Sequence, residues 1–318
     1  FMTVSRSKKA AAYEKSRSSS LWKKIAPNWE LYLFILPVVA YFIIFHYWPM
    51  YGIQIAFRDY KGTLGIWGSE WVGLEHFQRF FNSYYIWRLI RNTITISLYQ
   101  LLVGFPIPII MALGFNELKS SKLKKFAQTV TYAPHFISLV VLVSMIQTFL
   151  SPSVGMVNRL IEAMGGEAVY FMTEAKYFKT IYVFSGVWQN MGWNSIIYMA
   201  ALAGVDPSLH EAAIMDGATR FDRIWHINIP SILPTITIML IMNVGGLMNV
   251  GFEKVFLMQN SLNMESSDII STYVYRMGMQ QGQYSFSAAV GLFNSVINFI
   301  LLITVNAITK KIGETSLW

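Results

Sequence analysis

Long apolar stretches separated by shorter polar segments run along most of the chain. The first covers residues 31–52, about the 20 residues that a helix needs to cross a hydrocarbon layer of roughly 30 Å. Five more stretches of comparable length follow, at Ile90–Gly114, Phe126–Leu150, Lys179–Ala203, Pro230–Phe256 and Ser285–Thr309. Pro106 and Pro108 in the second stretch predict a kink, because proline lacks the backbone N–H donor. The pattern predicts an all-α integral membrane protein with six transmembrane helices and a short helical segment between the third and the fourth.

The distribution of basic residues predicts the orientation of these helices. Residues 1–30 carry seven Lys and Arg among serines and alanines, which is typical of a solvated tail. Further cations follow the second, fourth and sixth stretches, at Lys119, Lys122, Lys124, Lys125, Arg220, Arg223, Lys310 and Lys311. The positive-inside rule then places both termini in the cytoplasm. We expect a basic tail over residues 1–30, a six-helix membrane domain over residues 31–318, and a cytoplasmic loop at residues 204–229.

Composition supports a membrane protein and removes several kinds of site. The chain has 318 residues, of which 54% are hydrophobic and 13% charged, whereas soluble domains carry roughly a quarter charged residues. A net charge of +8 does not indicate nucleic-acid binding here, because the cations gather between apolar stretches. Cysteine is absent, and the five histidines are scattered without the spacing of a metal site. We therefore predict no metal ligands and no thiol chemistry.

The loop before the fifth stretch contains an ordered motif. Its residues are Glu211, Ala212, Ala213, Asp216, Gly217, Phe221 and Pro230. Pro207 and Ser208 favour the start of a short helix, with Glu211 in its first turn beside the positive end of the helix dipole. The alanines keep one face small, so that another protein can come close, and Gly217 permits a turn with positive φ. The alternative is an ordinary amphipathic loop helix that rests on its own bundle.

This motif resembles the coupling loop of binding-protein-dependent ABC importer permeases, with Ile229 in place of the family's leucine. Further segments are similar to the polysaccharide and lipoprotein branch of carbohydrate permeases, namely Tyr47–Gly52, Ala56–Tyr60, Trp71–Phe77, Tyr132–Ser138 and Gly155–Met172. The resemblance implies a type I ABC importer permease fold. It also implies a channel-forming subunit that imports an oligosaccharide or polysaccharide across the bacterial inner membrane, with an acidic, alginate-like cargo as one candidate.

The resemblance also implies partners. The sequence holds no G-x-x-x-x-G-K-[ST] segment, so we expect no ATP hydrolysis by this chain and no cofactor bound to it. The family implies a second, related permease that completes a heterodimer, two ATPase subunits that hold ATP and Mg, and an extracytoplasmic solute-binding protein. Carbohydrate and membrane lipid are the other expected contacts, and nucleic acid is not one.

Polar side chains inside the apolar stretches are candidates for a substrate path, because an amide in hydrocarbon is costly unless it is paired or faces water. These candidates are Trp188, Gln189, Trp193, Asn194, Asn243, Asn249, Asn294 and Asn298. Indole rings can stack on sugar faces while amides exchange hydrogen bonds with hydroxyls. Trp188 and Gln189 lie on adjacent helical stripes, so both cannot face one pore. The alternative is that these amides join helices to one another.

Two other classes of function fit the sequence less well. An ion-coupled secondary transporter would need carboxylates within the membrane, yet Glu253, near the end of the fifth stretch, is the only acidic residue in the six stretches. A membrane enzyme would need a clustered nucleophile and base, which the sequence does not offer. An ABC permease for peptide or glycerol-phosphate stays open, because only the branch motifs speak against it.

Overall fold

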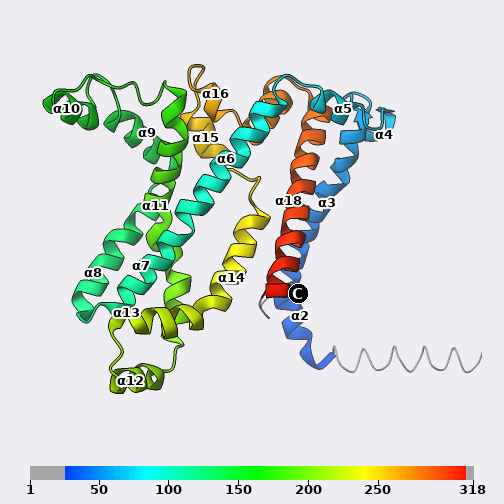
Figure 1. Ribbon diagram of the computed structural model, residues 1–318. Helices are drawn as coiled ribbons and strands as arrows, with labels where there is room; N and C mark the ends of the chain where they lie inside the picture. The colour runs from blue at the N-terminus through cyan, green and yellow to red at the C-terminus, as the bar shows by residue number, and fades with distance from the viewer. Residues whose placement is uncertain (1–25, 313–318) are drawn as a thin grey trace, which may run out of the picture. The chain divides into compact units, whose positions relative to one another are not determined.

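A computed structural model describes residues 26–312, which are almost entirely helical (Figure 1). The predicted basic tail lies outside the described residues, apart from its last five positions. The chain divides between Gln54 and Ile55 into two compact units.

The N-terminal unit is a single helical run. Its elements are η1 (Ala26–Asn28), α2 (Trp29–Phe42), η2 (Ile43–Tyr47), α3 (Trp48–Met50) and the start of η3 (Tyr51–Phe57). Residues Trp29–Phe57 are long and apolar enough to cross a membrane, which confirms the first predicted span. Pro37 lies inside α2 without ending it.

The second unit begins with a small antiparallel pair of strands, β1 (Arg58–Asp59) and β2 (Glu70–Trp71), in which Arg58 faces Trp71 and Asp59 faces Glu70. Helices α4 (Gly65–Gly68) and α5 (Glu75–Phe81) flank the second strand. The elements that follow are α6 (Ile86–Gly104), α7 (Pro106–Glu117), α8 (Ser121–Tyr132), η4 (Ala133–Phe136), α9 (Leu139–Phe149), α10 (Met156–Ala163), α11 (Ala175–Ala203), α12 (Pro207–Met215), α13 (Arg220–Arg223), η5 (Ile224–Asn228), α14 (Ile229–Gly245), α15 (Phe252–Met258), α16 (Met264–Ser267), α17 (Ile270–Tyr275), η6 (Arg276–Gln280) and α18 (Tyr284–Ile312).

Four helical runs among the described residues are long and apolar enough to cross a membrane, at Trp29–Phe57, Ile86–Glu117, Arg220–Gly245 and Tyr284–Lys311. A fifth is obtained if the bent pair Ser121–Phe136 and Leu139–Phe149 is one span. The predicted count of six is therefore not reached by these criteria. Helix α11, the fourth predicted span, has 29 residues and a length of about 43 Å. Its amide-rich centre keeps it out of the apolar set.

The third predicted span, Phe126–Leu150, is not one continuous helix. The chain bends by 99° between Phe136 and Leu139. Pro134 has no N–H to continue the helical ladder, and Ile137 and Ser138 adopt extended backbone. The Ser138 hydroxyl then caps α9 by accepting the backbone N–H of Val141.

The fifth span also ends earlier than predicted. Helix α14 stops at Gly245, residues 246–251 are not helical, and α15 starts a new helix at Phe252. A Cβ atom on Gly245 would lie 2.5 Å from Leu302 of α18, so this glycine allows the two helices to meet. Gly246 and Gly251 favour the break that follows because glycine is a poor helix former.

The second span is interrupted for one residue next to its first proline. Helix α6 ends at Gly104 and α7 begins with Pro106 in its first turn. Phe105 between them keeps helical dihedral angles, φ −76° and ψ −45°. The two helices therefore continue one another as one run from Ile86 to Glu117.

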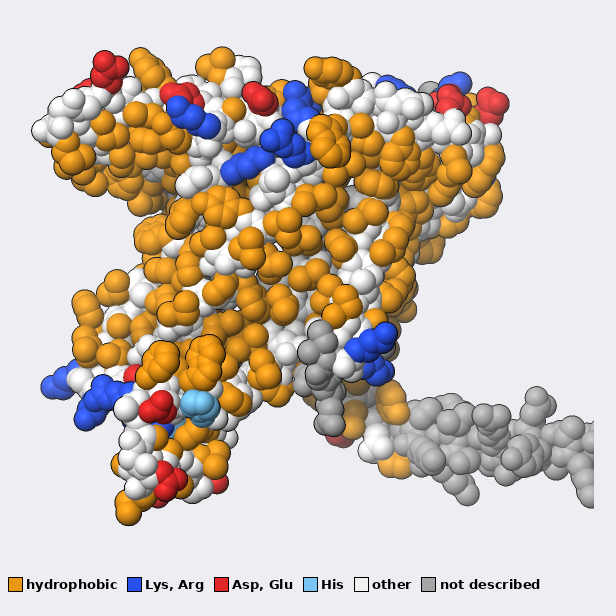
Figure 2. Space-filling model, viewed as in Figure 1, with side chains coloured by type: hydrophobic (Ala, Val, Ile, Leu, Met, Phe, Trp, Pro, Cys, Tyr) orange, Lys and Arg blue, Asp and Glu red, His pale blue; other side chains and the backbone are white. Residues whose placement is uncertain are grey.

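Helix α11 is the centre of the second unit, where it packs against α6, α7, α8 and α14 (Figure 1). It contributes to two buried apolar clusters, one with Tyr182 and Val183 and one with Tyr198. A third cluster contains Phe80 and Phe286 and no residue of α11. Helices α12 and α13 lie at one end of this unit, and α10, α15 and α16 at the other. Orange apolar side chains cover the middle of the visible face, while charged side chains gather towards its ends (Figure 2). This distribution fits a membrane-embedded protein.

Candidate functional site

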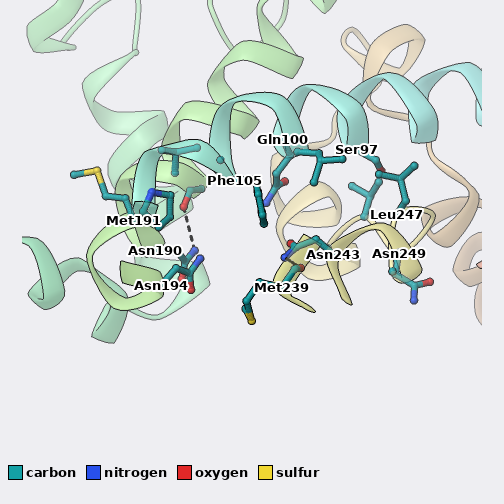
Figure 3. Close-up of a pocket in the computed structure, with 18 of the residues that line it drawn as sticks. Ser97, Gln100, Phe105, Asn190, Met191, Asn194, Met239, Asn243, Leu247 and Asn249 are labelled. Carbon is teal, nitrogen blue, oxygen red and sulfur yellow. Dashed lines mark hydrogen bonds between the residues drawn. The ribbon is translucent and has the colours of Figure 1, made fainter. Parts of the chain in front are cut away.

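A cavity of about 450 Å³ lies between α6, α11, α14 and the non-helical segment 246–251 (Figure 3). Gln100 on α6, Asn190 and Asn194 on α11, and Asn243 on α14 bring amide groups to its wall. Ser97 adds a buried hydroxyl with no hydrogen-bond partner among the described protein atoms. Such convergent amide and hydroxyl groups can exchange hydrogen bonds with a polyhydroxylated ligand.

One face of α11 supplies much of this wall. Tyr182, Gly186, Asn190, Asn194 and Tyr198 all line the cavity and follow one another at intervals of four residues. Residues four apart lie on the same face of a helix, which explains why these five project together. The Asn190 amide donates to the carbonyl of Gly186 at 3.1 Å and accepts a hydrogen bond from His135 at 2.9 Å.

The break after α14 brings two of the predicted path residues to the cavity. Asn243 lies in the last turn of α14 and donates to the carbonyl of Met239 at 2.7 Å. Asn249 lies in the segment 246–251, where its side-chain oxygen accepts from Asn294 at 3.1 Å and from Asn298 at 3.0 Å. The two amides on α18 do not line the cavity, and they position Asn249.

The other predicted path residues do not line this cavity, although Gln189 lines a second cavity beside it. Trp188 is 42% exposed and lines neither this cavity nor the second one. Trp193 stacks on the ring of His135 with centroids 4.5 Å apart. Gln189 is buried and donates to the carbonyl of Ile137 at 2.8 Å. Both candidate stripes of the fourth span therefore turn away from the main cavity, which faces the adjacent stripe of Asn190 and Asn194.

A second cavity of about 400 Å³ adjoins the first and contains residues that the sequence prediction missed. Gln100, Tyr182, Gly186, Asn190 and Gly251 line both cavities. Lys254 of α15 lines only the second and is 6% exposed. A lysine near the end of a predicted apolar stretch resembles a residue at the membrane interface. Nothing in the sequence therefore indicated that Lys254 is buried.

The loop motif forms a compact turn between two helices. Asp206 caps α12 by accepting the backbone N–H of Ser208 at 2.9 Å, and this hydrogen bond lowers the pKa of the Asp206 carboxyl. Gly217 has φ of 80°, which confirms the predicted positive φ. The backbone N–H of Ala218 donates to the carbonyl of Ala213 at 2.9 Å, as in the glycine-ended helix termini called Schellman motifs.

One detail of the predicted loop was wrong. Glu211 is the fifth residue of α12, so it lies in the second turn and not in the first. The helix dipole therefore acts on it only weakly, because that effect fades within the first turn. Glu211 and Ala212 are exposed, as is Asp216, while Ala213 is half-buried.

Around this loop several large apolar side chains face outwards. Met215 is 85% exposed and Phe221 72% exposed, and the ring of Phe221 stacks on that of Trp225. Ile214 is also exposed. Several large exposed apolar side chains on one short segment favour a surface that another protein covers.

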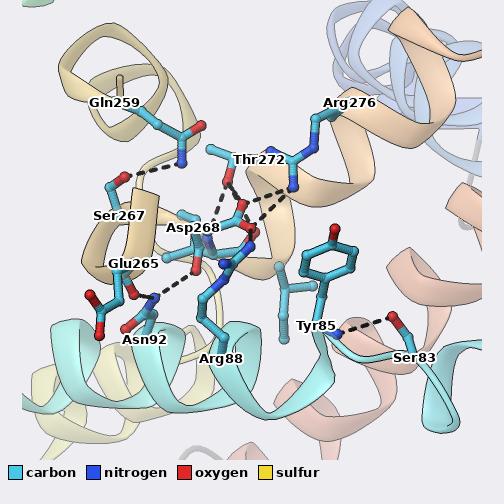
Figure 4. A network of polar contacts seen from close by, with 12 residues as sticks. Ser83, Tyr85, Arg88, Asn92, Gln259, Glu265, Ser267, Asp268, Thr272 and Arg276 are labelled. Atoms are coloured by element: carbon cyan, nitrogen blue, oxygen red, sulfur yellow. Dashed lines mark hydrogen bonds and ion pairs between the residues drawn. The ribbon is translucent and has the colours of Figure 1, made fainter. Parts of the chain in front are cut away.

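At the opposite end of the unit, a polar network joins α6 to α17 (Figure 4). The buried carboxylate of Asp268 forms ion pairs with Arg88 at 2.8 Å and with Arg276 at 3.1 Å. The Asn92 amide donates to the backbone carbonyls of Glu265 and Asp268. This network holds the α15–α17 region against α6, because each of its polar groups would be costly to leave unpaired.

Among residues 26–312 no three side chains of His, Cys, Asp or Glu converge as metal ligands. Amides, hydroxyls, aromatic rings and one buried lysine line the two cavities, together with the exposed Glu253.

Comparisons with known proteins agree with this geometry. The family described as "Binding-protein-dependent transport system inner membrane component" matches residues 104–314. The polygalacturonan/rhamnogalacturonan transport system permease protein YteP of Bacillus subtilis is 43% identical over 309 residues, which cover 97% of this chain and 96% of YteP. A chain in the crystal structure of a bacterial ABC transporter involved in the import of the acidic polysaccharide alginate is 41% identical, with a TM-score of 0.86 over 92% of this chain and 99% of that chain. A second crystal structure, of the bacterial alginate ABC transporter in complex with an alginate pentasaccharide-bound periplasmic protein, matches at 40% identity and a TM-score of 0.86, over 93% and 99% of the two chains.

Proposed function

Because the chain belongs to the family of binding-protein-dependent transport system inner membrane components, we propose that it carries an acidic polysaccharide, or oligosaccharides made from one, through the bacterial inner membrane. It is a permease subunit of a sugar-importing ABC transporter, as the resemblance in its sequence predicted. Its relatives are translocation components, and ATP is hydrolysed in partner subunits.

The observation that carries the choice of cargo is similarity over nearly the whole chain. The two crystal structures named above, at about 40% identity, are of an alginate importer, and YteP is named for polygalacturonan and rhamnogalacturonan. The cavity between α6, α11 and α14 adds a chemical reason, because its amides and the hydroxyl of Ser97 suit sugar hydroxyls. Asn194, Asn243 and Asn249 are the predicted path residues that this proposal retains.

The loop with α12 is proposed as the coupling element that contacts an ATPase subunit. Its exposed Ile214, Met215 and Phe221 offer an apolar surface, and Gly217 holds the turn that presents them. In this proposal a second related permease completes the channel, two ATPase subunits hold ATP and Mg, and a solute-binding protein delivers the cargo. The chain itself binds no cofactor, and both termini lie in the cytoplasm, where the basic segments favour them.

The test is uptake by cells with and without this subunit. Cells that express the whole importer receive radiolabelled uronate oligosaccharides, neutral oligosaccharides of the same length, a peptide, or glycerol-phosphate. We expect uptake of the uronate oligosaccharide that disappears when the gene for this chain is deleted and returns when it is restored. Uptake of only neutral sugar would contradict the acidic cargo, and uptake of only peptide or glycerol-phosphate would contradict a carbohydrate cargo altogether.

A further inference from the structure

Lys254 is a buried cation without a buried counter-ion. Lys254 is 6% exposed, and among residues 26–312 no carboxylate lies within ion-pair distance of its ammonium group. The ammonium donates one hydrogen bond, to the backbone carbonyl of Tyr182 at 2.9 Å, and lies 4.8 Å from the centroid of that residue's ring. An ammonium group has three donors, so two are left for another acceptor. A buried charge is costly unless a partner compensates it.

The architecture of α11 makes room for this ammonium beside the second cavity. A Cβ atom on Gly186 would lie 3.2 Å from Nζ of Lys254, so glycine at this position lets the lysine end reach the cavity wall. Gly186 lines both cavities, and so do Gln100 and Asn190. The cation therefore adjoins the amide-lined space proposed for the cargo.

The chemistry of the surroundings favours an oxyanion as the missing partner. Gln100 and Gln189 bring amide groups to the same cavity as Lys254, and amide N–H groups together with an ammonium are donors that suit a carboxylate. Glu253 also borders the cavity, but it is exposed and its side chain leaves α15 about 100° away from that of Lys254. It does not neutralise the lysine.

We propose that Lys254, with the amides beside it, forms a subsite for the carboxylate of a uronate unit during passage of the cargo. The subsite rests on the proposed function, because it has no role for a neutral sugar. It would let the channel prefer acidic over neutral chains at the point where the two cavities meet. The competing explanation is a purely structural one, in which Lys254 only ties α15 to α11 through the carbonyl of Tyr182.

The test uses the complete importer reconstituted in lipid vesicles. Uptake is measured for a uronate oligosaccharide and for the same oligosaccharide with its carboxyl groups reduced to alcohols. Lys254→Gln removes the charge but keeps an N–H donor for the Tyr182 carbonyl, and Lys254→Met removes both. Lys179→Gln is the matched control, because Lys179 is also on a cavity-forming helix but donates to Thr95 and lines neither cavity.

We expect both Lys254 variants to raise the KM for the acidic oligosaccharide about tenfold or more, the effect of losing a charge-assisted contact. Uptake of the reduced oligosaccharide should change by less than about twofold. Lys179→Gln should leave both cargoes unaffected.

Three results would overturn the subsite. Wild-type kinetics for the acidic cargo in Lys254→Gln, with lower complex yield only in Lys254→Met, would assign Lys254 a structural role. An equal loss for both cargoes would exclude recognition of the carboxylate. If the wild-type importer takes up only the reduced oligosaccharide, the proposed cargo is wrong. The subsite then fails with it, before any variant is compared.

Discussion

Asp268→Asn should destabilise the second unit strongly, although it only replaces one carboxylate oxygen by an NH2 group and leaves the shape of the side chain almost unchanged. The carboxylate of Asp268 is fully buried, and its partners Arg88 and Arg276 are 29% and 22% exposed. A neutral amide leaves the two guanidinium charges that now share this carboxylate without a compensating negative charge. Loss of this network would release α17 from α6, two helices that are far apart in the sequence.

The magnitude follows from the burial of the three groups. Removal of one member of a buried ion pair typically costs about 3–5 kcal/mol, because the remaining charge stays uncompensated. Water reaches both arginines, so we expect the low end, about 3 kcal/mol. At roughly 2–4 °C for each kcal/mol, this corresponds to a fall of about 6–12 °C in the apparent Tm.

The assay is thermal unfolding of the purified importer in one detergent at one scan rate, because unfolding of such complexes is a kinetic measurement. Glu174→Gln is the matched control. Glu174 pairs with Lys176 at 2.7 Å, but their side chains are 40% and 65% exposed, and exposed pairs contribute about 0–1 kcal/mol. If Asp268→Asn lowers the Tm no more than Glu174→Gln does, the network does not hold this end of the fold together.

Three further variants test other parts of the structure. Gly217→Leu should abolish both uptake and the stimulation of ATPase activity by loaded binding protein, because positive φ costs a non-glycine residue about 1–2 kcal/mol at this turn; normal values of both would contradict the coupling role. Gly192→Ala should destabilise the complex by about 1–3 kcal/mol and so lower its yield and Tm, since the new Cβ would lie 2.2 Å from a backbone carbonyl oxygen of α8. Gly114→Ala, which meets no atom within 4 Å, is its control, and equal stability of the two would refute this packing. Asn194→Ala should reduce uptake per assembled complex, whereas Trp188→Ala should not, and the reverse result would move the path to the other face of α11.

Hydropathy predicted the location of the helices better than their continuity. The first, second and sixth spans are apolar helical runs as expected, because a run of apolar residues determines where a chain can cross lipid. The bend at Ile137–Ser138 and the break after Gly245 were missed, since a hydropathy average is insensitive to a short interruption. Local signals were present, namely Pro134 before the bend and two adjacent glycines at the break.

The candidate site shows a different limit. Three of the amides predicted for a substrate path, Asn194, Asn243 and Asn249, line one cavity. The tryptophans were included because of their affinity for sugar faces, yet Trp193 packs on His135 and Trp188 borders neither cavity. Sequence periodicity assigns residues to stripes of a helix, but which stripe faces a cavity depends on the neighbouring helices.

The break after α14 explains how a lysine distant along the chain reaches the cavity. Tyr198 of α11 and Ile232 of α14 belong to the same apolar cluster. Gly186 lies 12 residues before Tyr198, or about 18 Å along the helix, so an unbroken antiparallel α14 would bring a residue near 244 to its level. Lys254 would then lie about 15 Å beyond Gly186, whereas its ammonium in fact contacts that level of α11.

Irregular backbone at membrane depth is tolerated only where it faces protein or a water-filled cavity. Segment 246–251 meets that condition because five of its six residues border the main cavity. The same glycines that interrupt α14 therefore do two things. They place the polar side chain of Asn249 in the wall of the cavity. They also shorten the chain along the membrane normal, so that Lys254 of α15 contacts α11. A helix-favouring substitution in this segment should consequently alter the position of Asn249 and of Lys254 together, which couples the amide wall to the cationic subsite.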